Sequence, residues 1–161
     1  MIRRVLIVSG LVAILGLVGW EVSSKERLLA SGETVLLMLA PKDPRSLIQG
    51  DYMSLEYAIA RAWPQDASWP REGALIVSAD DFGVAQFQRL DRGEPVVSVE
   101  HRLTYRIRNG RLQIGTTAFY FQEGTADTWA GARYGEFRVA PDGTSLLVGL
   151  RDAERRRIGT R

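Results

Sequence analysis

Apolar and polar residues alternate along most of the chain from Glu33 onward, and residues that favour turns separate the alternating segments. A period of two is typical of strands that bury one face. Because the segments follow one another with no helical crossover between them, we expect an all-β fold, an antiparallel meander that closes into a small barrel or sandwich. The expected strands cover residues 33–40, 51–60, 73–79, 84–90, 96–108, 111–122, 133–140 and 145–151.

The strongest hairpin pattern lies between residues 96 and 122. Asn109 and Gly110 tolerate the positive φ angles of a two-residue type I′ turn, and long alternating segments flank them. The apolar residues of the two strands would share the buried face: Leu103, Tyr105, Ile107, Leu112 and Ile114. The residues between them on the first strand would face water: Arg102, Thr104, Arg106 and Arg108.

Shorter turn patterns divide the rest of the chain. The segment "APDG" at 140–143 predicts a hairpin between the last two strands. Two further turns are expected at "ADDFG", residues 79–83, and at "DRGEP", residues 91–95. Residues 122–134 depart from the alternation and would hold one helical turn around Trp129.

The N-terminal segment has a different pattern, with no charged residue over positions 5–20. An apolar helix of this length approaches the thickness of a bilayer core, and Trp20 would lie at the membrane interface. We therefore expect one uncleaved transmembrane anchor over residues 5–22. The alternative is a signal peptide that is cleaved after Ser24, where small residues are found.

Charges around this helix predict its orientation. Arg3 and Arg4 form a positive stub at residues 1–4, and positive residues are enriched on the cytoplasmic side of membrane helices. The rest of the chain would then lie outside the cytoplasm, in the periplasm of a bacterium with the helix in its inner membrane. From the membrane outward we expect a helical stalk at 23–32, a β domain at 33–152 and a basic tail at 153–161.

Composition excludes several kinds of active site. The chain has no cysteine and one histidine, His101, which removes thiol nucleophiles, disulfides and multi-histidine metal centres. Its formal net charge is only +2, so no overall field favours nucleic acid. We predict neither a metal nor a cofactor.

Two polar features are candidates for chemistry. His101 would fall on the apolar face of its strand with Val97 and Val99, where a hydrogen-bonded core histidine is the more common role and catalysis the alternative. Asp80 and Asp81 could hold a hard cation or share a proton, but a pair between two strands more often bonds its own turn. Neither feature identifies a catalytic residue.

Aromatic and basic segments are candidates for contact surfaces. Trp63 and Trp69 lie in one proline-containing loop, and Trp129 lies in the later irregular segment. Exposed aromatics would suit a partner or the membrane interface, although they could equally cap the end of the barrel. The arginine-rich tail could contact anionic lipid headgroups or an acidic partner, but a solvated, untethered terminus is the simpler expectation.

The most specific pattern is "GDYMSLEY" at residues 50–57. It resembles the motif that names the bacterial GDYXXLXY family, and "DPRSLIQ" before it and "EFRVAPDGTSLLVGLRD" near the C-terminus are also similar to that family. All fixed positions of the motif match: Gly50, Asp51, Tyr52, Leu55 and Tyr57. The resemblance implies a membrane-anchored exported domain with no established activity, accompanied by a polytopic membrane protein.

The turn before the motif has a physical interpretation. Pro44 restricts Asp43 to an extended conformation, and Gly50 permits the positive φ needed to leave the turn. Asp51 would accept N–H groups of the turn or pair with Arg45, a latch whose loss would cost about 1 to 3 kcal/mol. If Asp51→Ala abolished function without lowering the melting temperature, the latch hypothesis would be wrong.

The strand after this turn carries the rest of the motif. Leu55 and Tyr57 share a face with Met53 and should be the first core residues beyond the turn, while Tyr52 lies on the other face. The motif is therefore predicted to hold a corner of the scaffold and not a catalytic loop.

These features predict a single-pass membrane protein whose extracytoplasmic β domain acts in protein interaction or scaffolding beside a polytopic membrane protein, without catalysis. The alternative is a small-ligand carrier or hydrolase that uses the interior of the β domain, with His101 and acidic loop residues as its polar groups. A carrier or enzyme needs a cavity with converging polar groups. A scaffold predicts a filled core and an exposed apolar or aromatic surface.

Overall fold

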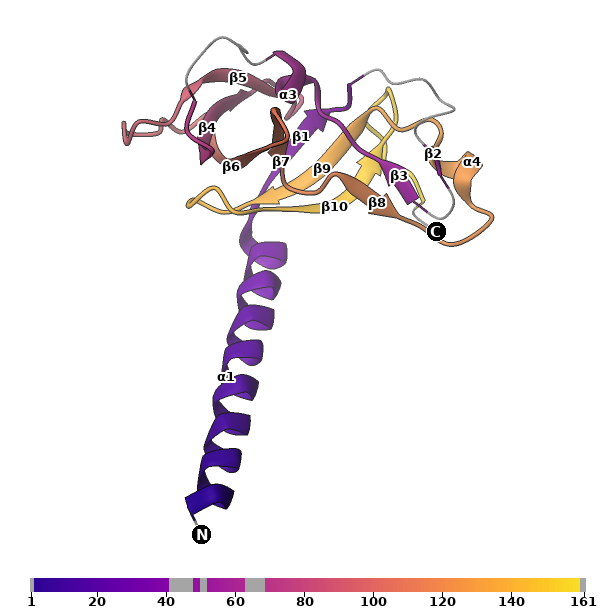
Figure 1. Cartoon of the computed structure of the whole chain (residues 1–161). Coiled ribbons are helices and arrows are strands. Elements are labelled where there is room, and N and C mark those ends of the chain that lie inside the picture. The colour runs from indigo at the N-terminus through magenta and orange to yellow at the C-terminus, as the bar shows by residue number, and fades with distance from the viewer. Residues whose placement is uncertain (1, 41–47, 50–51, 63–68, 160–161) are drawn as a thin grey trace.

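The structure is a computed structural model of the chain, and it describes residues 2–40, 48–49, 52–62 and 69–159. One long helix, α1 (Ile2–Ser31), leads into a β domain (Figure 1). Six residues singled out in the sequence lie outside the described residues, so the predicted latch stays a prediction: Asp43, Pro44, Arg45, Gly50, Asp51 and Trp63.

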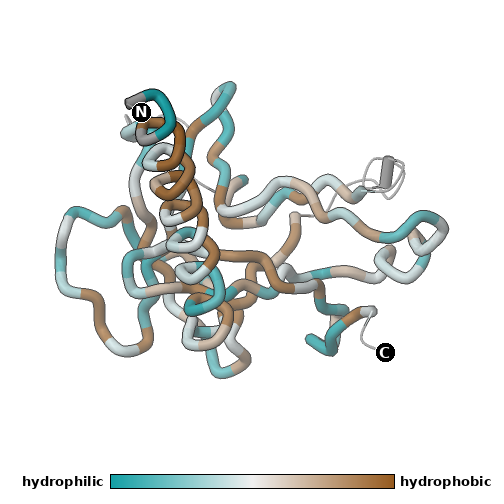
Figure 2. The backbone as a smooth tube through the Cα atoms, turned by 90° about the horizontal axis from the view of Figure 1, so that it is seen from below, coloured by the Kyte–Doolittle hydropathy of each residue, from teal (hydrophilic) through white to brown (hydrophobic). Residues whose placement is uncertain are grey.

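Helix α1 is long and apolar enough to cross a membrane. Its apolar segment, Leu6–Ser31, would extend over about 39 Å, more than the hydrocarbon core of a bilayer. No part of its most apolar stretch is buried against the described chain, and Figure 2 shows the apolar colour running along the helix. A signal sequence would share this length and composition.

The β domain consists of three antiparallel sheets, which confirms the predicted all-β class. In the first, β9 (Tyr134–Val139) lies between β1 (Glu33–Met38) and β10 (Ser145–Arg151). The second sheet has the order β2 (Ile48–Gln49), β3 (Tyr52–Ser54), β8 (Ala118–Tyr120). The third has the order β5 (Ala85–Leu90), β4 (Glu72–Ala79), β6 (Glu100–Arg108), β7 (Arg111–Ile114).

Backbone contacts between sheets curve the domain into half a barrel (Figure 1). The N–H of Leu36 in β1 donates to the carbonyl of Gly83 at 2.8 Å, beside a bridge between Leu36 and Val84. A second bridge joins Leu39 to Tyr57, just beyond β3. The first sheet therefore contacts both of the others around one core.

The predicted hairpin at residues 96–122 is confirmed at its turn and in its register. Asn109 and Gly110 have φ angles of 51° and 71°, as a type I′ turn requires. Tyr105 pairs with Ile114, and Ile107 pairs with Leu112. The residues expected on the inner face are buried or packed against the core: Leu103, Tyr105, Ile107, Leu112 and Ile114.

Two strand boundaries in this region differ from the predicted ones. The strand expected over 96–108 begins only at Glu100, because the N–H of Glu100 closes a turn onto the carbonyl of Val97. The strand expected over 111–122 is divided into β7 and β8 at Gly115, whose φ of +57° breaks the extended backbone. A β-carbon at Gly115 would lie 2.7 Å from Cε1 of Phe137, so only glycine fits there.

The strand expected over 51–60 is also shorter. Strand β3 ends at Ser54, and α3 (Ala58–Ala62) follows it. The sequence of α3 is Ala-Ile-Ala-Arg-Ala, and alanine has the highest helix propensity, which outweighs the alternation over these few residues. A second short helix, α4 (Ala126–Trp129), confirms the helical turn expected around Trp129.

The C-terminal segment contradicts the expectation of a solvated tail. The N–H of Ile158 donates to the carbonyl of Leu150 at 2.9 Å, and the Ile158 side chain packs against the core cluster. Arg157 and Arg151 both donate to the carboxylate of Glu136, a β9 residue that is only 2% exposed. Ion pairing with a buried carboxylate holds residues 152–158 against the domain.

Candidate functional site

The described part of the motif forms part of the core. Leu55 and Tyr57 are buried, as predicted, and Met53 beside them is buried as well. The N–H of Leu55 donates to the carbonyl of Thr117 at 2.8 Å. The motif thus joins β3 to the segment that precedes β8.

Tyr57 makes contacts in three directions. Its hydroxyl donates to the carbonyl of Thr116 at 3.0 Å, and its ring packs edge-on against Phe137, with ring centroids 5.5 Å apart. Its backbone forms an isolated antiparallel β-bridge with Leu39. Burial raises the pKa of the Tyr57 hydroxyl above its ordinary value of 10.0, so the group stays protonated at physiological pH. These properties fit a structural donor and not an acid–base catalyst.

Tyr52 lies on the other face of β3. It is half-buried and packs against Tyr120, its partner across the strands, with ring centroids 5.7 Å apart. Tyr120 itself is 75% exposed. The two tyrosines therefore form the outer surface of the sheet whose inner surface holds Met53.

His101 lies beside a carboxylate at the start of the β domain. Its Nδ1 is 2.9 Å from Oε2 of Glu33, and its side chain is 14% exposed. The neighbours expected on its apolar face, Val97 and Val99, precede β6 and are exposed. The pair links β6 to the first residue of β1, directly after helix α1.

The junction between α1 and the β domain is closely packed. Leu28 is 6% exposed, and the N–H of Gly32 donates to its carbonyl at 2.9 Å. Arg138 of β9 donates through Nη1 to the carbonyl of Gly32 and to Oγ1 of Thr34, both at 2.9 Å. A cationic side chain on a carbonyl at the end of a helix is favourable, and here it fixes the helix to the first sheet.

This packing makes Gly32 a sensitive position. A β-carbon there would lie 2.5 Å from the carbonyl oxygen of Leu28 and 3.2 Å from Cβ of Arg138. We expect Gly32→Ala to destabilise the chain by about 1 to 3 kcal/mol, because the backbone must move to relieve the overlap. Thermal unfolding in detergent would measure this. Gly131→Ala is the control, since a β-carbon at Gly131 meets nothing within 4 Å, and equal melting temperatures would contradict the prediction.

Asp80 forms a turn, as expected, and shows no sign of an ion site. Its Oδ1 accepts the N–H groups of Phe82 and Val84, each at 2.9 Å. Asp81 is exposed beside it. Within the described ranges, no group of three or more His, Asp or Glu side chains is placed to hold a metal ion.

The described tryptophans pack against the domain. Trp69 lies between Phe87 and Tyr105, with ring centroids 6.0 and 5.9 Å away. Trp129 packs edge-on against Phe119, with ring centroids 4.7 Å apart. Both are half-buried against the core cluster, which agrees with the capping alternative; a role in partner contact stays a prediction.

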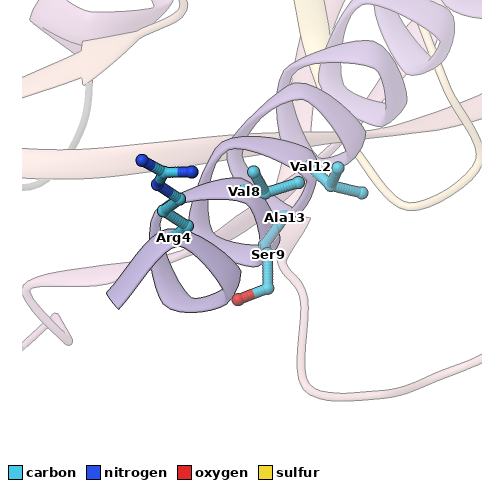
Figure 3. A pocket seen from close by; sticks show the side chains of 5 residues that line it. All are labelled: Arg4, Val8, Ser9, Val12 and Ala13. Carbon is cyan, nitrogen blue, oxygen red and sulfur yellow. The ribbon is translucent and has the colours of Figure 1, made fainter. Parts of the chain in front are cut away.

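A surface groove on α1 lies far from these features. Figure 3 shows Arg4, Val8, Ser9, Val12 and Ala13 along one side of the helix. The helix alone forms this groove, because no other described residue lines it. It is therefore an open surface of the helix and not an enclosed ligand site.

A comparison with protein families agrees with the family that the motif indicates. The model of the GDYXXLXY protein family matches residues 14–150, from within α1 into β10. No curated protein and no solved structure matches the chain.

Proposed function

The chain belongs to the GDYXXLXY family, and on that premise we propose that it is a bacterial membrane-anchored protein whose β domain acts in interaction or scaffolding beside a polytopic membrane protein. In this proposal α1 is an uncleaved anchor, the N-terminus is cytoplasmic and the β domain is periplasmic. The observation that carries the proposal is the uncovered apolar helix, packed at its C-terminal end against a β domain whose core is filled.

The helix supports a location in the bilayer. Exposed leucine, isoleucine and valine side chains cover it from residue 6 to residue 22, and such a surface is stable only when lipid or another protein covers it. Arg3 and Arg4 precede the apolar segment and favour a cytoplasmic N-terminus. The packed junction at Leu28 and Gly32 would transmit the position of a partner helix to the β domain.

The β domain supports interaction over catalysis. Large side chains with almost no exposure fill its interior, among them Phe137, Leu37, Met53 and Leu103. His101 pairs with Glu33 near the helix junction, and Asp80 bonds its own turn, so these polar groups do not converge. Val97 and Val99, at 57% and 59% exposure, offer apolar surface that a partner would bury.

Photo-crosslinking in membranes would test the partner. We would place one photoreactive amino acid at Ala13 and, as a matched control, the same amino acid at Leu15. These positions lie on nearly opposite faces because an α-helix turns about 100° per residue. We expect an adduct with one polytopic protein from the Ala13 face, and mainly lipid adducts from Leu15.

Gentle detergent purification and intact-mass measurement complete the test. We expect a stoichiometric polytopic protein to copurify with a chain that begins at Met1. A monomer carrying a bound small molecule, with no protein adduct from either position, would overturn the proposal. A mature chain that begins at Lys25 would show cleavage after Ser24 and contradict the anchor.

A further inference from the structure

A polar groove of about 840 Å³ lies where the outer face of β6 and β7 meets the turn between β9 and β10. Its walls come from segments far apart in the chain, and no acidic residue except Glu72 lines it. The lining residues that could recognise a ligand are Thr104, Arg106, Arg108, Gln113, Thr144 and Ser145. The groove lies outside the filled core and is distinct from the groove on helix α1.

The groove carries excess positive charge. Nε of Arg106 lies 3.2 Å from Oε1 of Glu72, and both side chains are exposed. Arg108 lines the groove and forms no ion pair within the part of the chain that the structure describes. Arg111 lies directly opposite Arg108 across the hairpin and lines a separate pocket. Like charges directly opposite on two strands destabilise a hairpin, so an anion placed there would relieve the repulsion.

Hydroxyl groups line the rest of the groove. Four threonines and Ser145 contribute them, and Gln113 adds an amide. Oγ of Ser145 is buried and has no hydrogen-bond partner among the described residues. A buried hydroxyl without a partner is unfavourable, so a rotation of the Ser145 side chain toward the groove would let its hydroxyl bond a polar ligand.

The groove is held in shape before any ligand arrives. The carbonyl of Gly143 accepts hydrogen bonds from the N–H of Thr104 at 3.0 Å and from its Oγ1 at 3.1 Å. These bonds fix the β9–β10 turn to β6. A preformed site loses less entropy on binding than a mobile one.

We propose that this groove binds an anionic saccharide, with Arg108 at its acidic groups and the threonine and serine hydroxyls at its sugar hydroxyls. Arginine pairs in fork geometry with carboxylates and phosphates, and hydroxyls and amides match the alternating donors and acceptors of a sugar. The extent of the hydroxyl-lined wall favours a saccharide over a simple anion. This role goes beyond the proposed anchoring and partner contact and does not depend on them.

Calorimetry on the full chain in detergent would test the site with trigalacturonic acid as the probe and maltotriose as its neutral counterpart. We expect trigalacturonic acid to bind, more weakly as salt is raised, and maltotriose not to bind. Arg108→Gln should weaken binding by about 10- to 100-fold, the effect of losing one charge-assisted hydrogen bond. The matched control Arg92→Gln removes an exposed arginine outside the groove and should change nothing.

Three results would overturn the proposal. In the first, trigalacturonic acid does not bind the unaltered chain. In the second, maltotriose binds as tightly as trigalacturonic acid. In the third, Arg92→Gln and Arg108→Gln weaken the binding of trigalacturonic acid equally. Arg108 is exposed, so its replacement should leave the melting temperature unchanged and any loss of binding can be assigned to the groove.

Discussion

Tyr57→Ala is expected to cost about 3 to 5 kcal/mol of unfolding free energy, a large part of the stability of an ordinary domain. The side chain is 2% exposed, and its removal leaves a cavity against Phe137. The substitution also removes the only hydroxyl bonded to the carbonyl of Thr116 in the described structure. Urea unfolding followed by tryptophan fluorescence would measure the loss.

Two further variants test why Tyr57→Ala lowers the unfolding free energy. Tyr57→Phe keeps the packed ring and loses one hydrogen bond, which should cost about 1 kcal/mol. Tyr120→Ala removes a tyrosine that is 75% exposed and should have a much smaller effect than Tyr57→Ala. If Tyr57→Ala and Tyr120→Ala unfold at the same urea concentration, the assignment of the motif tyrosine to the core is wrong.

Acid is expected to remove about 3 kcal/mol of stability through Glu136. Hydrogen bonds from Arg157 and then Arg151 hold the pKa of this carboxyl at about 2, against an ordinary value of 4.5, although burial opposes the shift. The folded chain therefore binds the proton less readily than the unfolded chain. The stabilisation is complete above about pH 4.5 and is lost as pH falls towards 2.

Glu136→Gln tests this assignment. The variant should be less stable than the unaltered chain at pH 7, by about 3 kcal/mol, and should lose less stability than the unaltered chain does between pH 5 and pH 2. Glu154→Gln is the matched control in the same region, because among the described residues Glu154 forms an ion pair only with Arg156, and both side chains are largely exposed. Denaturant titrations at several pH values would compare the three chains. An unchanged acid dependence in Glu136→Gln would contradict the role of this carboxylate.

The features that could be predicted from sequence depend on neighbouring residues. Asn109 and Gly110 adopt positive φ whatever lies beyond the hairpin, and Asp80 bonds N–H groups two and four residues away. The apolar segment of α1 needs no other part of the chain to form a helix long enough to cross a membrane. The inner positions of Leu55 and Tyr57, just beyond β3, agree with the period of two that the sequence predicts over residues 51–60.

The strand breaks could not be predicted, because they depend on distant contacts. Gly115 ends β7 at a point where Phe137, from a different sheet, leaves no room for a side chain. The alternation alone gave no reason to stop the strand there. Similarly, the groove combines Glu72 of β4, Arg106 of β6 and Ser145 of β10, and no short segment holds more than a part of it.

The sequence by itself determined the apolar helix, the turns, the alternation of the strands and the family. Only the tertiary structure decided that the arginine-rich C-terminal segment packs against the domain, that His101 pairs with Glu33, and that the polar residues of four strands form one groove. The physical reason is distance along the chain. Turn and helix propensities act within a few residues, whereas the partner of a charge or the covering of a side chain is set by residues that only folding brings together.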